Sequence, residues 1–130
     1  MQVTAPYSAE LGDQDPLQAI PNTIQQLERL TGEWPRDRFE RSYAPGKWTG
    51  SQILAHLAQT ELAIGTRARM AVVTPNYVAQ VWNQDDWIPL DARLAGRAAV
   101  DTFVAVARMN LSFFQGLSPA QRAIMFDHPE

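Results

Sequence analysis

A helix-start signal at Thr49 is the feature that most constrains what this chain can fold into. Thr49 and Gln52 have the spacing of a capping box, in which each side chain satisfies a free backbone N–H of the other residue. The residues that follow predict a helix over about 50–72. At about 100° per residue, one face of that helix would carry Ile53, Leu57, Ile64 and Ala68.

Two more helices are predicted on either side of this one. Asp15 and Pro16 have the form of an N-cap followed by a first-turn proline, and apolar residues then recur to Thr31. Pro21 falls inside that pattern, so a kink or a start near Pro21 is expected. A third helix is predicted over 91–115, with an apolar stripe of Val100, Phe103, Val104, Ala107, Leu111 and Phe114.

Shorter signals mark the ends of these helices. Gly32 and Gly116 are predicted C-terminal stops. Ser118, followed by proline, is predicted to start another helical turn that continues to about residue 126. Residues 1–14 read as a loose lead-in and residues 74–90 as a long irregular crossover.

Together these elements predict an all-α fold and one domain over residues 1–130. Three helices with apolar stripes favour a bundle, and a fourth helix is the expected cover. Little chain remains after residue 126 to build that helix, so most of it is missing from these residues.

Composition excludes several classes of function. The net charge is -3 and basic residues do not cluster, which argues against nucleic acid as a partner. No apolar run approaches the roughly 20 residues needed to span a bilayer, and no signal peptide is visible, so we expect a cytoplasmic protein without a membrane partner. The chain has no cysteine, no G-x-S-x-G and no P-loop sequence.

Two residues of the central helix stand out. His56 lies on the flank of the apolar face and is a candidate metal ligand, although a hydrogen-bonded interface histidine fits the same pattern. Glu61 falls within the apolar face, where a carboxylate needs a partner. It could pair with Arg108, or act as a general base near a metal.

The crossover carries a second group of candidate residues. Asp85, Asp86 and Trp87 follow one another in a segment that could line the mouth of a pocket. A solvated loop anchored to the core by Trp87 is an equally good interpretation of the same residues.

Four segments carry a resemblance to a known family: residues 46–61, 83–87, 107–121 and 127–130. In order and spacing they resemble the DinB/YfiT-like family of metal-binding four-helix bundles. The resemblance implies a divalent metal, nickel or zinc among others, held by three histidines, and His56 matches the first of them. The other two would form an H-x-x-x-H pair on the fourth helix, beyond Glu130, while His128 matches the linker before that helix.

The resemblance also implies a class of reaction. Such proteins include metal-dependent hydrolases and thiol-dependent S-transferases that act on small molecules, with the substrate not readable from these residues. Because the histidine pair is absent from the chain, a second hypothesis stays open. In it the protein binds no metal, and a homodimer covers the open helical face.

Overall fold

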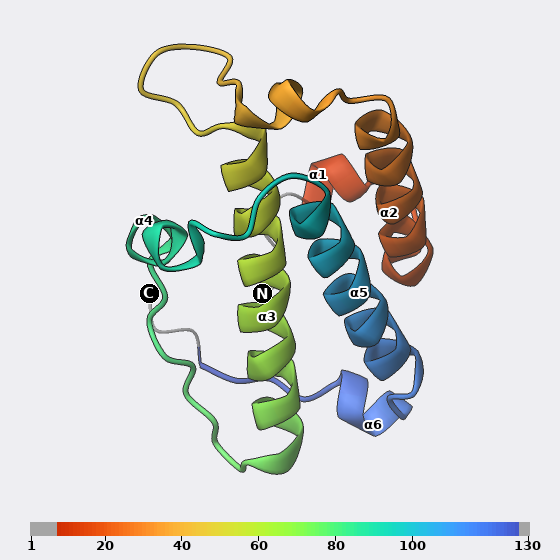
Figure 1. The fold of residues 1–130 in the computed structure, drawn as a ribbon. Coiled ribbons are helices and arrows are strands. Elements are labelled where there is room, and N and C mark those ends of the chain that lie inside the picture. The colour runs from red at the N-terminus through yellow and green to blue at the C-terminus, as the bar shows by residue number, and fades with distance from the viewer. Residues whose placement is uncertain (1–7, 128–130) are drawn as a thin grey trace.

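The computed structural model describes residues 8–127, and the long helices α2, α3 and α5 dominate it (Figure 1). They span Pro16–Gly32, Gly50–Val73 and Gly96–Gln115. The described residues include no strand, only two isolated bridges. The predicted all-α fold is confirmed, and a long fourth helix is absent from the described part of the chain.

Short helical elements occupy the segments between and beside the long helices. They are α1 (Ser8–Leu11), η1 (Arg36–Glu40), α4 (Gln84–Trp87), η2 (Ile88–Asp91) and α6 (Pro119–Arg122). Within the described residues, the lead-in and the crossover are therefore more ordered than the sequence predicted. None of the described helices is both long enough and apolar enough to cross a membrane.

The start of α3 follows the predicted capping box. The Thr49 hydroxyl accepts a hydrogen bond from the Gln52 N–H at 3.1 Å, and the Gln52 side-chain oxygen accepts one from the Thr49 N–H at 2.8 Å. These bonds satisfy two backbone donors that the first turn of a helix leaves free. The predicted start at Gly50 is confirmed, and the helix ends one residue later than predicted.

Other helix ends differ from the sequence predictions. Helix α2 starts at Pro16, where Asp15 accepts from the Leu17 N–H at 3.0 Å, so a start near Pro21 is wrong. A single proline removes only one backbone donor, and the helix continues through it. Helix α5 starts five residues later than predicted, because Asp91 ends η2 and residues 92–95 form an irregular turn. The last turn, α6, ends at Arg122 rather than near residue 126.

Helix α5 is the centre of the packing and contacts both α3 and α2 (Figure 1). Four residues of its predicted stripe are buried, and Leu111 and Phe114 are half-buried. The main core is formed by Ile24, Phe39, Leu54, Ala58, Ala99, Val100, Phe103, Val104 and Ala107.

The face of α3 that packs on α5 is only partly the predicted one, since Leu57 packs against the core but Ile53 and Ile64 do not. Ile53 and Ile64 are 41% and 48% exposed, whereas Leu54 is 2% exposed. Small residues occupy much of the buried surface of α3: Gly50, Ser51, Ala55, Ala58, Ala63, Gly65 and Ala71. At Gly65 helix α5 comes especially close, since a Cβ atom there would overlap the side-chain oxygen of Asn110. Leu57 and Ala68 of the predicted face are half-buried, so the described residues leave Ile53 and Ile64 as its uncovered part.

The crossover returns along the side of α3 that is opposite α5 in Figure 1, and Asp127, the last described residue, joins it there. The Ala79 N–H donates to the Asp127 carbonyl at 3.1 Å, and the Asp127 N–H donates to the Tyr77 carbonyl at 3.2 Å. The rings of Tyr77 and Phe126 lie 5.7 Å apart. This pairing ties the last described residues to the crossover.

Candidate functional site

His56 lies between two indole rings on the crossover side of α3. The centroid of its ring is 5.1 Å from that of Trp48, and 6.0 Å from that of Trp82 at an interplanar angle of only 5°. Trp82 in turn meets Trp87 edge-on at 5.6 Å. The rings restrict how the imidazole can rotate, so the crossover helps to hold His56 in one orientation.

One imidazole nitrogen of His56 forms no hydrogen bond within the described residues. Its Nδ1 atom is buried and has no hydrogen-bond partner there, which is unusual for a buried polar atom. Burial lowers the pKa of His56 below its usual value of 6.5, and the negative charge of Asp85 partly opposes this shift. At neutral pH the side chain is therefore mainly neutral, the state in which histidine binds metals.

Buried Gln59 docks the crossover on α3. Its side-chain nitrogen donates to the Trp87 carbonyl at 2.9 Å and to the Asp91 carboxylate at 2.6 Å. Asn83 caps α4 by accepting from the N–H groups of the next two acidic residues, Asp85 and Asp86. Sequence reasoning overlooked Gln59; the available signal was a polar residue between Ala58 and Ala63, four positions after Ala55.

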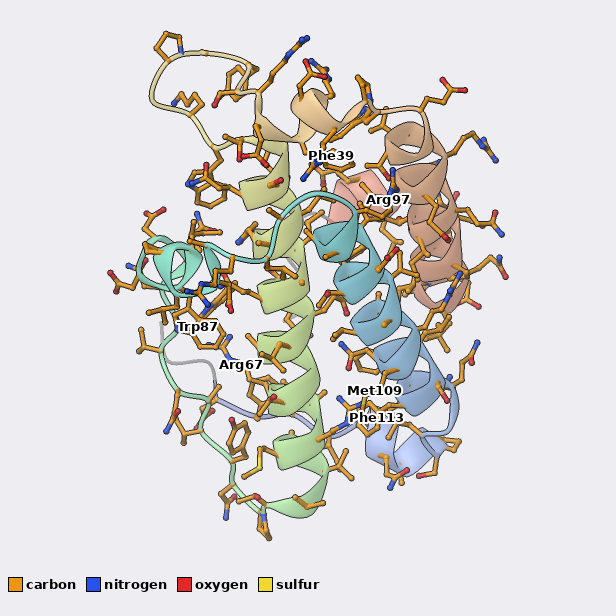
Figure 2. The ribbon with its side chains drawn as sticks, in the orientation of Figure 1. Phe39, Arg67, Trp87, Arg97, Met109 and Phe113 are labelled. Atoms are coloured by element: carbon orange, nitrogen blue, oxygen red, sulfur yellow. The ribbon has the colours of Figure 1, made fainter. Side chains whose placement is uncertain are left out.

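The two pocket residues predicted in the crossover have different surroundings. Trp87 is half-buried and lines a cavity of about 130 Å³ together with Tyr77, Trp82 and Arg67 (Figure 2). Arg67 crosses from α3 to this segment and donates to the Gln80 carbonyl at 2.6 Å. Asp86 is exposed and does not line this cavity.

Glu61 lies on a different side of α3 from His56. Five residues separate them, which at about 100° per residue places them roughly 140° apart around the helix. The Glu61 carboxylate accepts from the Asn110 side chain at 2.8 Å, and the same nitrogen also donates to the Glu61 backbone carbonyl at 2.8 Å. The predicted ion pair with Arg108 is wrong, since Arg108 pairs with Glu28 at 3.1 Å.

A complete metal centre is not present in the described part of the chain. Residues 8–127 contain no group of three or more histidine, cysteine, aspartate or glutamate side chains that could hold an ion. His56 offers one free nitrogen, whereas a catalytic zinc site typically uses three protein ligands. His128 lies outside the described residues, as does the predicted H-x-x-x-H pair.

Two curated relatives are similar to this chain in sequence, although no family model matches it. One, from Oceanobacillus iheyensis, is 27% identical over 114 residues, which cover 84% of this chain and 66% of the relative. The other, from Bacillus mycoides, is 21% identical over 115 residues, which cover 88% and 66%. Both are named "putative metal-dependent hydrolase". The chain thus spans slightly less than two thirds of their length.

The fold is similar to that of a solved structure, YfiT from Bacillus subtilis. The TM-score is 0.75 and the sequence identity 16%, over 87% of this chain and 66% of YfiT. YfiT is described as a probable metal-dependent hydrolase with an unusual four-helix bundle topology. The fold match confirms a YfiT-like fold, and the two sequence relatives support the resemblance to the DinB/YfiT-like family that residues 46–61, 83–87, 107–121 and 127–130 predicted.

Proposed function

We propose that this chain is part of a metal-dependent hydrolase in which His56 supplies one metal ligand. The unpartnered, buried Nδ1 atom of His56 between two indole rings carries this proposal. The names of the two relatives favour hydrolysis over the thiol-dependent S-transfer that the family resemblance also allows. The remaining ligands are proposed to lie beyond Glu130, with nickel or zinc as the proposed metal.

The described residues set the charge and orientation of the proposed ligand His56. Burial keeps the His56 imidazole neutral, and Trp48 and Trp82 hold its plane. Glu61 stays a candidate general base, although its carboxylate is bonded to Asn110 on another side of the helix. Trp87 is proposed to line a substrate pocket, and Asp86 its rim.

Removal of the imidazole tests the metal proposal. In the full-length protein, including any segment encoded after Glu130, we expect His56→Ala to lose most of the zinc or nickel that the wild type retains after dialysis, since one of three ligands is gone. Elemental analysis measures this, with His128→Ala as the matched control because the chain has only these two histidines. Equal metal content in wild type and His56→Ala would exclude His56 as a ligand. The gene sequence after the codon for Glu130 shows directly whether an H-x-x-x-H helix follows.

A second function is favoured by the uncovered face of α3. Ile53 and Ile64, 41% and 48% exposed, lie on the same side of one helix, and an apolar face of this kind is typical of interfaces. We propose as the alternative a metal-free interaction protein that forms a homodimer through this face.

Light scattering after size exclusion tests the homodimer. We expect Ile64→Lys to shift the wild-type dimer to a monomer, because a charge would be buried in the interface. Leu62→Lys is the matched control, since Leu62 is 54% exposed but lies on the far side of α3, beside the crossover cavity. A wild-type protein that is monomeric at all concentrations would rule this alternative out.

A further inference from the structure

The cavity of about 130 Å³ between α3 and the crossover is bounded mainly by apolar and aromatic side chains. Helix α3 forms one wall and the crossover the other, and Figure 2 shows Arg67 and Trp87 together on this side of α3. The apolar and aromatic part of the lining consists of Leu62, Ala63, Tyr77, Val81, Trp82 and Trp87.

Two indole rings of this lining form a corner. The ring planes of Trp82 and Trp87 are 77° apart, with the centroids at 5.6 Å. A flat ring that stacks on one indole would meet the other edge-on, and both are favoured contacts between aromatic groups. A saturated ring is puckered and has no π-system, so it gains neither contact. The shape of the corner therefore favours a planar aromatic ligand.

The volume of the cavity fits one unfused ring. An apolar cavity of about 150 Å³ in a protein core stays free of water and binds benzene. The present cavity is slightly smaller, at about 130 Å³. Two fused rings would not fit without displacement of the lining side chains.

The polar part of the lining disfavours a cationic ligand. Arg67 is the only charged side chain that lines the cavity within the described residues, and it donates to the Gln80 carbonyl at 2.6 Å. The Thr66 hydroxyl, also in the lining, donates to the Leu62 carbonyl at 2.8 Å and can still accept a hydrogen bond. An ammonium group would be repelled here, whereas a neutral hydroxyl has an acceptor.

Trp82 connects this cavity to the proposed metal ligand. It lines the cavity and also stacks on His56, with the ring centroids 6.0 Å apart. Ala63 of the lining follows His56 by seven residues, which places both on the same side of α3, about 10 Å apart along the helix axis. A molecule with its ring in the cavity could therefore extend along α3 to His56.

We propose that this cavity binds one neutral, unfused aromatic ring, and that it holds the aryl group of the hydrolase's substrate. The first statement depends on the cavity alone. The second rests on the proposed function, because it needs a reaction centre at His56.

Calorimetric titration of the full 130-residue chain with phenol tests the ring site. We expect saturable binding of one molecule. Cyclohexanol has the same ring size and hydroxyl group but no aromatic faces, and should bind at least about fivefold more weakly. 1-Naphthol should also bind more weakly, although it has more apolar surface to bury. Equal or tighter binding of cyclohexanol or 1-naphthol would overturn the proposal, and so would an absence of saturable heat with phenol.

Two variants locate the site. Ala63 is 9% exposed, and Ala63→Leu would fill part of the cavity, so phenol should bind at least about tenfold more weakly. Ala105→Leu is the matched control, since Ala105 is an exposed residue of α5 that does not line the cavity. Trp87→Leu removes one side of the corner and should reduce the preference for phenol over cyclohexanol to about twofold or less. Thermal unfolding checks that all three variants fold. Wild-type phenol affinity in Ala63→Leu, or an unchanged preference in Trp87→Leu, would overturn the proposal.

The ring site and the substrate role fail separately. Phenol binding needs no metal, because His56 does not line the cavity. Phenol binding by a wild-type protein that retains no metal would confirm the ring site and remove the substrate role together with the proposed function. In a full-length protein that retains metal, phenyl acetate should be hydrolysed with a higher kcat/KM than cyclohexyl acetate, and Ala63→Leu should abolish this preference. Equal kcat/KM for the two esters in the wild type would overturn the substrate role alone.

Discussion

Leu54→Ala should lower the free energy of unfolding by about 2–5 kcal/mol, the range for truncating a buried leucine. Leu54 is 2% exposed and belongs to the core between α3 and α5. The substitution removes buried methyl groups and leaves a cavity that the packed helices can only partly close. Urea unfolding of wild type and variant measures the difference.

The neighbouring residue provides the matched control. Ile53→Ala removes a similar apolar volume from the same turn of α3, but Ile53 is 41% exposed, so about 1 kcal/mol or less should be lost. The measurement is made at a concentration where the chain is monomeric. A larger loss for Ile53→Ala than for Leu54→Ala would mean that α3 packs through the face predicted from sequence, contrary to the structure.

Gly65→Ala should destabilise the protein by about 1–3 kcal/mol, although alanine is the better helix former. A Cβ atom at Gly65 would overlap the side-chain oxygen of Asn110 and lie 2.8 Å from an Arg69 nitrogen. These atoms cannot move freely, since Asn110 is 2% exposed and is bonded to both Glu61 and Arg69. Arg69 is itself held over the Phe113 ring, 4.5 Å from its centroid.

A double-mutant cycle assigns the cause of this effect. In an Asn110→Ala background the overlapping amide is gone, so Gly65→Ala should become neutral or stabilising by up to about 1 kcal/mol. Gly32→Ala is the control for helix propensity, because no atom lies within 4 Å of a Cβ built there. If Gly65→Ala costs the same with and without Asn110, steric overlap with that side chain is not the reason for glycine.

The capping signals in the sequence were reliable because they depend on neighbours in the chain. The capping boxes at Thr49 and Ser118 involve side chains and backbone groups three residues apart, and both form. The predicted apolar stripe of α5 was correct for a different reason. That helix packs on both sides, so its apolar residues find cover whichever neighbour they face.

Site residues illustrate the limits of sequence reasoning. His56 could be chosen from its place on the flank of α3, but Trp82, which stacks on it, comes from 26 residues later in the chain. The partner of Glu61 was wrongly predicted as Arg108, two residues before Asn110, which actually donates to it. A shift of two residues on a helix turns a side chain by about 200°, so the correct partner depended on how α5 is rotated.

The sequence by itself determined where the long helices lie, how two of the helical elements are capped, and that the chain resembles DinB/YfiT-like proteins. Only the tertiary structure decided which face of α3 is buried. Periodicity identified the large apolar residues Ile53 and Ile64, yet α5 packs on the side with small residues, because close approach of two helices needs little side-chain volume between them. The apolar pattern shows which side chains favour burial, whereas the position of the partner helix determines which of them are buried.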